Sequence, residues 1–517
     1  MPAMRSEPTN ANLYAALRGG FPENMQTVAV ETDSGLCYTW QDLEEGSAML
    51  ANLLESLQLP AGSRIAVQVE KSVEALLLYL ATLRAGLVFL PLNTAYQSAE
   101  LAYFNEDAKP AVVVCSARNF GWISKLAFTA GTAYVFTLNE DRTGSLLERA
   151  AALGRSHEVA QRAPGDLAAI IYTSGTTGRS KGAMVSHGNL LSNAQVLQEA
   201  WGWRSPRQGG DVLIHTLPIF HVHGLFVAIH GALLNGSKMI WLAKFDPKTV
   251  LRHLPQATVF MGVPTLYVRL LAEAGLNQAV VRNMRLFVSG SAPLQLETFV
   301  EWQKRTGHTI LERYGMSETV MLTSNPYFPE EGERIGGTVG RPLPGVQLRV
   351  LGDGAQPLAA AEVGNIQVKG PSVFQGYWNM PEKTAEEFTA DGFFKTGDVG
   401  RLDANGYVTI VGRSKDLIIS GGYNVYPAEI EGYINALPGV AESAVVGVPD
   451  ADFGEVGVAL VIAKPGAELD PNAILAALKA TLANFKIPKR CHVVAELPRN
   501  AMGKVQKNIL RSQFAKA

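Results

Sequence analysis

The sequence predicts an α/β protein: a large N-terminal domain of layered mixed sheets and helices with a β-rich subdomain, followed by a small α+β C-terminal domain. Three observations indicate this. Helical patterns alternate with short apolar runs in the first part of the chain, glycine and proline punctuate brief strands from about Gly336, and strands and helices alternate again after residue 412. A chain of 517 residues also exceeds the usual size of one domain.

The first part of the chain has the pattern of helices between parallel strands. The longest apolar stretch, 73–92, predicts a buried helix that runs into a strand, because Arg84, Gly86 and Pro91 interrupt it and disfavour a membrane span. Further strands are predicted from apolar runs that end at Gly, Pro or Ser, at 110–115, 168–175, 238–243, 257–263 and 285–291.

The last part of the chain predicts the β-rich subdomain and then a second unit. Brief strands are expected at 342–351, 363–370 and 406–412; a helix near Pro427, strands at 442–449 and 456–464 and a helix over 472–485 follow. We place the boundary after residue 412, giving domains 1–412 and 413–517, because the charged residues 413–416 (RSKD) suit a solvated hinge. The alternative is one continuous domain with a surface turn there.

The composition is that of a globular protein and disfavours several classes. Hydrophobic residues make up 47% and charged residues 18%, and the net charge of -2 without a basic run argues against nucleic-acid binding. Cys37, Cys115 and Cys491 lack the paired spacing of a zinc site or a disulfide framework, which favours a reducing compartment. The N-terminal residues have no signal pattern, so we expect a cytoplasmic protein.

Residues 172–182 (YTSGTTGRSKG) form a polar, glycine-rich loop after an apolar strand and before a segment leading into a helix. Backbone amides, hydroxyls and one ammonium group can surround phosphate oxygens there. The residues concerned are Thr173, Ser174, Gly175, Thr176, Thr177, Gly178, Lys181 and Gly182. The loop is not a Walker A motif, because a glycine follows the lysine where that motif needs Ser or Thr. A flexible linker is the alternative.

This loop resembles the phosphate-loop signature of the adenylate-forming superfamily, which includes acyl-CoA synthetases. Four further stretches are similar to the other core motifs of that superfamily and occur in the same order: 312–319 (ERYGMSET), 393–400 (FFKTGDVG), 406–431 and 498–507 (PRNAMGKVQK). The resemblance implies a mobile C-terminal domain and two half-reactions. ATP first activates a carboxylic acid as an acyl-AMP, and coenzyme A then takes the acyl group.

The resemblance also implies roles for charged residues. Glu318 would bind Mg²⁺ and Ser317 would reach a phosphate, whereas a helix N-cap serine with a first-turn glutamate is the alternative interpretation. Lys504 would bridge the acid and the α-phosphate as charge develops. Lys507 is interpreted as a structural or surface residue, and Lys415 as the hinge about which the small domain rotates.

The nucleoside and the thiol have their own expected contacts. Asp398 can accept both ribose hydroxyls, because a carboxylate takes two hydrogen bonds at once, and Arg413 would assist it; a turn aspartate is the alternative. Gly422 would face the pantetheine channel, where a missing side chain leaves room. By the same resemblance the adenine pocket is lined by Gly290, Ser291, Ala292, Arg313, Tyr314 and Gly315.

The acid is expected to bind near an apolar stretch that contains two histidines. His221 and His223 have no third metal ligand nearby in sequence, so a packed pair is favoured over a metal site, and the resemblance places His221 at the pocket wall. Arg285 precedes the strand that leads to the adenine-binding turn. Its guanidinium would pair with a second carboxylate of the substrate; an edge arginine is the alternative.

Several longer stretches resemble the malonyl-CoA synthetase subfamily, which implies malonate as the acid. These are 70–96, 220–228, 257–271 and 311–327. The apolar Val320 and Leu322 depart from the pattern of some members, which leaves a larger or methylated diacid such as methylmalonate open. The magnesium ion, ATP and coenzyme A follow from the same resemblance.

Three other functions are weighed against this hypothesis. One is a short- or medium-chain monocarboxylate acyl-CoA synthetase, and another is a stand-alone adenylation enzyme that loads a carrier protein. The third is a non-catalytic nucleotide-binding protein, which the joint presence of Lys181, Glu318, Asp398 and Lys504 disfavours.

Overall fold

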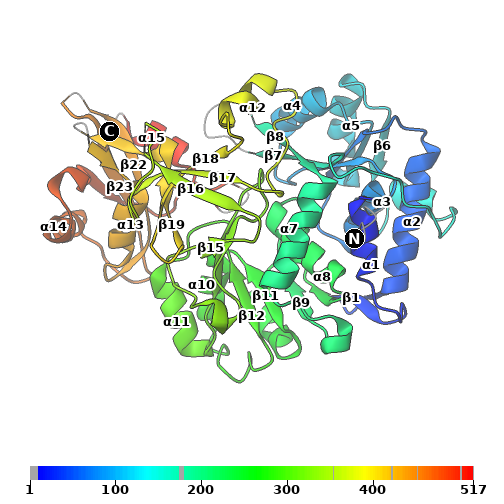
Figure 1. Cartoon of the computed structure of the whole chain (residues 1–517), viewed down its shortest axis with the longest axis horizontal. Helices are drawn as coiled ribbons and strands as arrows, with labels where there is room; N and C mark the ends of the chain where they lie inside the picture. Colours follow the sequence, from blue (N-terminus) through cyan, green and yellow to red (C-terminus); the bar gives the residue numbers. More distant parts are fainter. Residues whose placement is uncertain are drawn as a thin grey trace, which may run out of the picture.

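The computed structural model describes residues 10–173, 180–352, 354–420, 423–450, 452–500 and 504–515, and the strands in these ranges form four sheets. Figure 1 shows the C-terminal part as a lobe at the left of a larger body, with the N-terminal segments at the right. The predicted α/β class is confirmed, with several mixed sheets in a large N-terminal part and a smaller C-terminal unit.

The first sheet has the strand order β6-β5-β3-β4-β7-β8 and is parallel except for its last pair. Its strands are β3 (Arg64–Gln68), β4 (Val88–Pro91), β5 (Val112–Cys115), β6 (Tyr134–Thr137), β7 (Leu167–Thr173) and β8 (Lys181–Ser186). Alternate side chains face opposite sides: Val112 and Val114 enter the central core, while Val113 and Cys115 pack under α4 (Ser98–Ala108) and α5 (Phe120–Thr129).

The second sheet has the order β15-β14-β13-β12-β11-β9-β10-β1-β2 and is parallel from β13 to β1. Its strands are β1 (Val28–Thr32), β2 (Cys37–Thr39), β9 (Val212–His215), β10 (Lys238–Trp241), β11 (Val259–Gly262), β12 (Leu286–Ser289), β13 (Leu311–Tyr314), β14 (Thr323–Ser324) and β15 (Arg341–Pro342). Its outer face is covered by α9 (Pro247–His253), α10 (Pro264–Leu271) and α11 (Leu296–Thr306).

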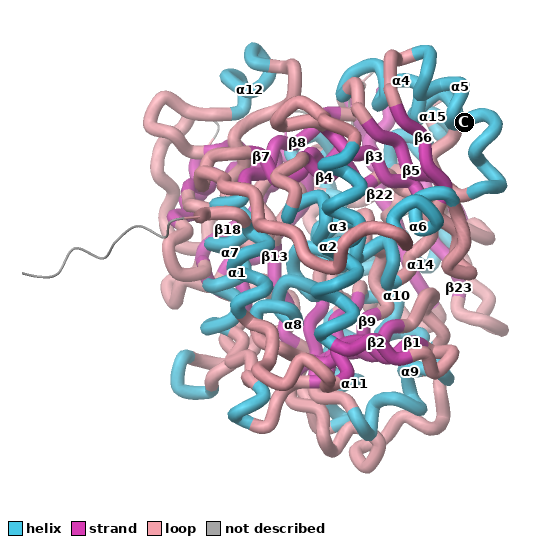
Figure 2. The backbone as a smooth tube through the Cα atoms, turned by 90° about the vertical axis from the view of Figure 1, so that its right-hand side faces the viewer, coloured by secondary structure: helices cyan, strands magenta, loops and turns pink. Residues whose placement is uncertain are grey.

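A layer of helices lies between these two sheets, as Figure 2 shows with the first sheet above and the second below. The helices are α1 (Leu13–Gly19), α2 (Trp40–Ser56), α3 (Val73–Arg84), α6 (Ser145–Ala150), α7 (His187–Ala200) and α8 (His230–Leu234). Every residue of α3 is buried, and β4 follows it, so the buried helix running into a strand is confirmed. A π-helical stretch, His223–Ile229, leads into α8.

The glycine-rich loop joins two antiparallel strands, which differs from the expected strand-to-helix connection. β7 and β8 pair from Leu167↔Ser186 to Thr173↔Lys181, and α7 begins only at His187, where Ser186 forms a capping box with Asn189. The residues after the loop pair antiparallel with β7 and add the last strand of the sheet. The amino end of α7 therefore lies six residues beyond Lys181. The backbone amides of that helix end are not part of the loop that was expected to bind phosphate.

The third sheet is the β-rich subdomain, with the antiparallel order β16-β17-β18-β19. Its strands are β16 (Gln347–Leu351), β17 (Gly364–Lys369), β18 (Phe394–Leu402) and β19 (Val408–Arg413), and α12 (Pro381–Glu387) lies before β18. The three predicted strands are confirmed as β16, β17 and β19. β18 was not predicted as a strand, because its TGD triplet has the composition of a turn.

The fourth sheet forms the core of the C-terminal lobe. It contains β20 (Ile418–Ser420), β21 (Tyr423–Val425), β22 (Val440–Asp450), β23 (Gly454–Ala463) and β24 (Arg490–Val493), with α13 (Pro427–Asn435), α14 (Pro471–Thr481) and α15 (Lys507–Phe514). α14 ends before the expected residue 485, because Leu482 is extended. A short 3-10 helix, Ser414–Asp416, separates β19 from β20, and the domain boundary at this place stays a prediction.

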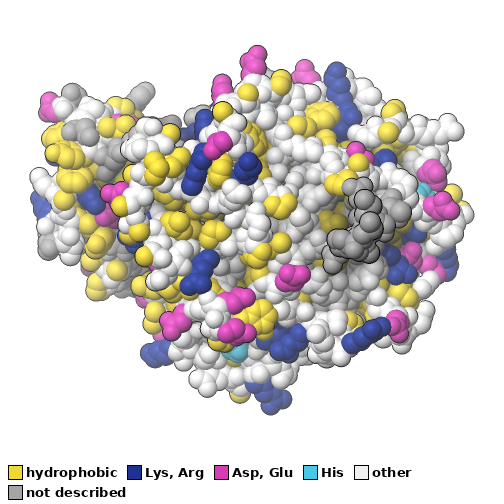
Figure 3. All heavy atoms as spheres, in the orientation of Figure 1, with side chains coloured by type: hydrophobic (Ala, Val, Ile, Leu, Met, Phe, Trp, Pro, Cys, Tyr) yellow, Lys and Arg dark blue, Asp and Glu magenta, His cyan; other side chains and the backbone are white. Residues whose placement is uncertain are grey.

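Among the described residues, none of the helices is long and apolar enough to cross a membrane. On the face in Figure 3, Lys and Arg side chains are interspersed with Asp and Glu. The outline in the same view has a notch at the upper left, where the lobe meets the body.

We expect acid to destabilise the fold through buried histidines such as His230. Its Nε2 lies 2.7 Å from the Tyr79 hydroxyl, and burial lowers the pKa of His230 to about 3. The unfolded chain binds a proton below about pH 6.5 and the folded chain does not, so stability falls as the pH drops, by about 1.4 kcal/mol per pH unit for such a group. Urea unfolding at about pH 7.5 and about pH 5 measures this.

The variant His230→Gln keeps an acceptor for Tyr79 and lacks the titrating group. It should lose less stability than the wild type between the two pH values, by about 2 kcal/mol. Equal losses in the two proteins would contradict the assignment.

Candidate active site

The site residues meet at the carboxyl edge of the second sheet. β12 and β13 are parallel neighbours, with Val288 opposite Leu311 and Ser289 opposite Glu312. The turn 290–292 follows β12 and the turn 315–320 follows β13, so both turns open at the same edge. The predicted adenine-lining residues Gly290, Ser291, Ala292, Arg313, Tyr314 and Gly315 are thereby brought together.

Asp398 lies across this edge on the neighbouring third sheet and is 4% exposed. It is the register partner of Arg413, whose Nε lies 2.7 Å from Asp398 Oδ1. The Tyr314 hydroxyl donates to the other carboxylate oxygen. Each oxygen keeps a further lone pair, so the carboxylate can still accept hydroxyl groups.

The turn after β13 is tight and holds Glu318 in the interior. A Cβ at Gly315 would lie 1.8 Å from the Val320 carbonyl oxygen, so only glycine fits. Val320 is buried in the left-handed region with φ 55°, an unfavourable conformation for a β-branched residue. The turn leaves Ser317 half-buried and Glu318 5% exposed.

Glu318 fits a role as a single-carboxylate magnesium ligand. Burial raises the pKa of Glu318, while a hydrogen bond of 3.0 Å from the Tyr377 hydroxyl and the charges of Arg413 and Lys181 oppose that rise. Within the described ranges no group of three or more His, Cys, Asp or Glu could hold a metal. Mg²⁺ typically needs only one or two carboxylates when substrate phosphates supply its other ligands.

Lys181 and Thr173 face each other at the end of the β7–β8 hairpin where the loop joins the two strands. Lys181 Nζ lies 3.6 Å from Glu387 Oε1 and 4.0 Å from the ring centroid of Tyr377. Desolvation lowers the pKa of Lys181, and the nearby Glu387 and Glu318 raise it. Ser174, Gly175, Thr176, Thr177, Gly178 and Gly422 lie outside the described residues.

Lys504 comes from the C-terminal lobe and lies near the same charges. Although the residue is exposed, desolvation of its ammonium group and repulsion by Arg413 lower its pKa, while Asp398 and Asp416 raise it. Lys415 is exposed in the 3-10 helix between the sheets. Lys507 pairs with Glu431 at 2.6 Å, which agrees with a structural residue.

The two histidines lie at the amino end of the π-helical stretch, and both are neutral. Burial and the charges of Arg313 and Lys504 lower the pKa of His221 to about 3. Burial and Arg313 lower the pKa of His223 well below its usual range. His223 Nδ1 lies 3.4 Å from Ser291 Oγ, and its buried Nε2 has no partner among the described residues.

Arg313 is a buried guanidinium with no counter-ion among the described residues. It is 3% exposed, and its Nε and Nη2 have no hydrogen-bond partner in the described part of the chain. The guanidinium packs on Gly290, where a Cβ would lie 2.4 Å from Arg313 Cζ. Burial lowers the pKa of Arg313 to about 9, and no carboxylate of the described residues offsets it. An unpaired buried charge is costly, so an anionic ligand would stabilise it.

Arg285 is not brought together with these residues, which corrects its predicted role. It precedes β12 at the amino end of the strand, whereas the site lies beyond the carboxyl end. Its guanidinium forms a bidentate pair with the buried Asp211, at 2.8 and 2.6 Å, and donates to the Trp201 carbonyl oxygen. Arg285 therefore already has its carboxylate, and we do not retain it as the substrate's partner.

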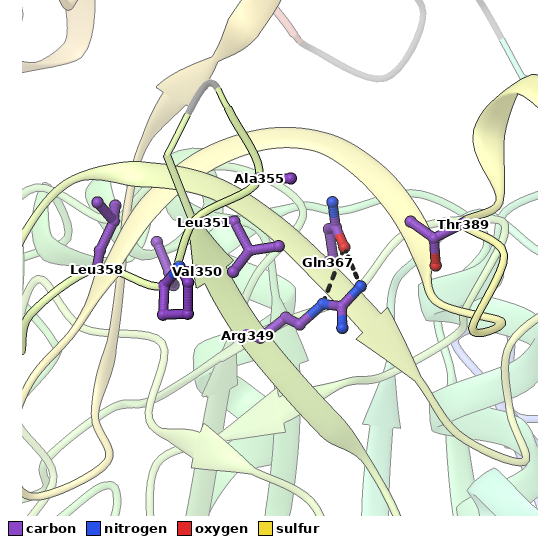
Figure 4. A pocket seen from close by; sticks show the side chains of 8 residues that line it. Arg349, Val350, Leu351, Ala355, Leu358, Gln367 and Thr389 are labelled. Carbon is purple, nitrogen blue, oxygen red and sulfur yellow. Dashed lines mark hydrogen bonds between the residues drawn. The ribbon is translucent and has the colours of Figure 1, made fainter.

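Two residues in the site were not predicted. Tyr377 contacts both Glu318 and Lys181, and Glu387 contacts Lys181. Both residues belong to a segment in which the sequence shows no recognised motif. The groove in Figure 4, of about 480 Å³, lies elsewhere, on the third sheet. Its Arg349 donates to Gln367 and pairs with Asp391. That guanidinium is thus satisfied within the protein.

The family descriptions match this geometry. Residues 21–378 match the family described as AMP-binding enzyme, and residues 429–504 match the AMP-binding enzyme C-terminal domain. The chain belongs to the AMP-binding enzyme family.

Relatives of this AMP-binding enzyme include malonate–CoA ligases. One from Arabidopsis thaliana is 38% identical over 88% of this chain and 78% of its own length. The mitochondrial malonate–CoA ligase ACSF3 of Homo sapiens is 35% identical over 83% of this chain and 79% of its own length. The crystal structure of ATP-bound MatB from Rhodopseudomonas palustris has a TM-score of 0.94 and 51% identity, and covers 98% of this chain and 99% of that chain.

Replacing Arg285 should affect stability and not the choice of acid. Arg285→Ala leaves Asp211 buried and unpaired, so the free energy of unfolding should fall by about 3–5 kcal/mol in urea titrations. The ratio of kcat/KM for malonate to that for acetate should stay unchanged. The control Arg349→Ala breaks the bidentate pair with the exposed Asp391 and should cost far less. A selective loss of malonate activity in Arg285→Ala would restore the original prediction.

Proposed function

We propose that this AMP-binding enzyme is an AMP-forming malonate–CoA ligase. It converts malonate, ATP and coenzyme A into malonyl-CoA, AMP and pyrophosphate through malonyl-AMP. The observation that supports malonate is Arg313, for which we propose a role at the acid in place of its expected role at the adenine. A buried guanidinium with no carboxylate partner among the described residues suits an acid with a second negative charge. A monocarboxylate would leave that charge unpaired.

In the first half-reaction, a malonate carboxylate oxygen attacks the α-phosphorus of ATP. The new bond to phosphorus forms as the bond to the bridging oxygen breaks, and pyrophosphate leaves. We assign Asp398 and Arg413 to the ribose, and Lys181 with the loop 172–182 to the phosphates. Lys504 approaches the reacting carboxylate and α-phosphate, where its charge stabilises the transition state. His221 stays neutral and borders the acid without repelling Arg313.

The second half-reaction transfers the acyl group to sulfur. The thiol of coenzyme A loses its proton, the thiolate attacks the malonyl carbonyl carbon, and the bond from that carbon to AMP breaks. We assign the hinge to Lys415, so that the C-terminal lobe rotates and removes Lys504 after adenylation. Gly422 would then line the approach of the thiol.

We propose that Glu318 holds Mg²⁺ together with the ATP phosphates. When bound, the metal neutralises charge on those phosphates. A metal that takes most of its ligands from the phosphates needs few protein ligands, and the turn 315–320 offers one buried carboxylate, Glu318. We also propose a cytoplasmic location, supported by three cysteines that are all unpaired.

The reaction can be tested by measuring pyrophosphate release with malonate, methylmalonate, acetate and octanoate, with and without coenzyme A. We expect malonate to give the highest kcat/KM, and coenzyme A to be required for sustained turnover. A higher kcat/KM for acetate or octanoate would contradict the malonate assignment.

The variant Arg313→Met should change which acid is used. Because it removes a buried charge partner of the distal carboxylate, kcat/KM for malonate should fall by on the order of a hundredfold or more, while that for acetate changes little. The measurement is pyrophosphate release with each acid.

Arg334→Met is the matched control. Arg334 is also partly desolvated, but its guanidinium donates to the carbonyl oxygens of Pro326, Thr309 and Tyr327. The control should keep the wild-type ratio between malonate and acetate. If Arg313→Met lowers kcat/KM for malonate and for acetate by the same factor, Arg313 does not select the diacid.

A further inference from the structure

Tyr377 lies between the two groups assigned above to the ATP phosphates and the metal. It is 3% exposed, and it belongs to a segment without regular secondary structure between β17 and α12. None of the motifs that identify the nucleotide site includes this residue. Its position needs a separate explanation.

Backbone hydrogen bonds attach this segment to the phosphate hairpin. Tyr377 forms an antiparallel bridge with Ala183 of β8. The Trp378 amide donates to the Gly182 carbonyl at 2.7 Å, and the Met184 amide donates to the Gly376 carbonyl at 2.9 Å. The segment therefore pairs with β8 immediately after Lys181, which starts that strand.

The same segment is attached to the turn that contains Glu318. The Phe374 amide donates to the Glu318 carbonyl oxygen at 2.7 Å. The Phe374 ring packs edge-on against Tyr377 with centroids 4.9 Å apart, which restricts the phenol. Three residues of one short segment thus fix Tyr377 relative to both β8 and the turn.

The side chain of Tyr377 uses two different parts for the two groups. Its hydroxyl donates to Glu318 Oε1 at 3.0 Å, and its ring face lies 4.0 Å from the ammonium of Lys181. A charge-assisted hydrogen bond orients a carboxylate, and a ring face attracts a cation independently of the hydroxyl. Substitutions can therefore separate the two contacts.

We propose that Tyr377 is a positioning residue that places the magnesium carboxylate Glu318 through its hydroxyl and the phosphate lysine Lys181 through its ring. Metal binding and phosphate binding are coupled by this one side chain. The inference rests on the proposed nucleotide and metal roles of those two residues, and it is independent of which acid is used.

The test is ATP binding by calorimetry, with Mg²⁺ and with EDTA, in the absence of acid and coenzyme A. Tyr377→Phe keeps the ring, so metal-free ATP affinity should match the wild type, while the tightening by Mg²⁺ should fall by on the order of tenfold. Tyr377→Met also removes the ring and should weaken metal-free ATP binding several-fold. Glu318→Gln removes the proposed metal carboxylate and is the reference for complete loss of the tightening of ATP binding by Mg²⁺.

Tyr407→Phe is the matched control. Tyr407 is 4% exposed, donates its hydroxyl to the Glu333 carbonyl at 2.7 Å, and has Arg341 over its ring at 4.5 Å. It lies at the β18–β19 turn, at the opposite end of that hairpin from Asp398 and Arg413. This variant should bind ATP as the wild type does, with and without Mg²⁺.

Two results would overturn the proposal. One is a magnesium effect in Tyr377→Phe equal to that in Tyr407→Phe, and the other is equal metal-free affinity in Tyr377→Met and Tyr377→Phe. Thermal melting checks that each variant folds, and Tyr377→Phe decides the proposal if Tyr377→Met does not fold. If the wild type itself fails to bind ATP, the proposed function fails, which is a separate outcome.

Discussion

A positive charge buried against a glycine is the constraint on which the site depends. The guanidinium of Arg313 can lie beside the turn after β12 only because Gly290 has no side chain. β12 and β13 are parallel neighbours, so both residues reach the same edge of the sheet. The adjacent histidines stay neutral near this charge, and the described residues offer it no carboxylate. An anionic substrate would supply the negative charge that the described residues do not.

The same edge also explains how two separate units contribute to one reaction. Asp398 and Arg413 are paired across β18 and β19, and Arg413 ends the last strand of its sheet. Two residues later the chain reaches Lys415, and a new sheet begins at Ile418. A rotation there would move Lys504 while leaving the proposed nucleoside contacts of Asp398 in place. This arrangement suits a reaction in which one pocket serves two successive steps.

Much of the fold could be predicted because local pattern and burial agree. The apolar runs before Gly290 and around residues 110–115 are strands buried on both faces, and their composition reflects this. The β7–β8 hairpin was not predicted, because the polar loop hides the pairing of the two strands. β18 was missed for a related reason: a strand that contains the triplet TGD has the composition of a turn.

Site residues that belong to a motif could be predicted from the sequence, whereas residues whose contacts depend on packing could not. Glu318, Asp398, Arg413 and Lys504 lie close to one another as the motifs implied, although their individual roles stay predictions. Arg285 precedes β12 and Arg313 lies within β13, but the sequence alone does not show which of the two guanidinium groups is paired with a carboxylate of the protein. Only the three-dimensional structure places Asp211, 74 positions away in the chain, against Arg285. Tyr377 acts through contacts with distant segments, which a single sequence does not reveal.

The most direct measurement is a crystal structure of the protein with malonate and a non-hydrolysable ATP analogue. The account predicts that the distal carboxylate of malonate pairs with the guanidinium of Arg313 beside Gly290, and that Arg285 remains paired with Asp211. A distal carboxylate bound elsewhere, with Arg313 making no contact to the substrate, would contradict it.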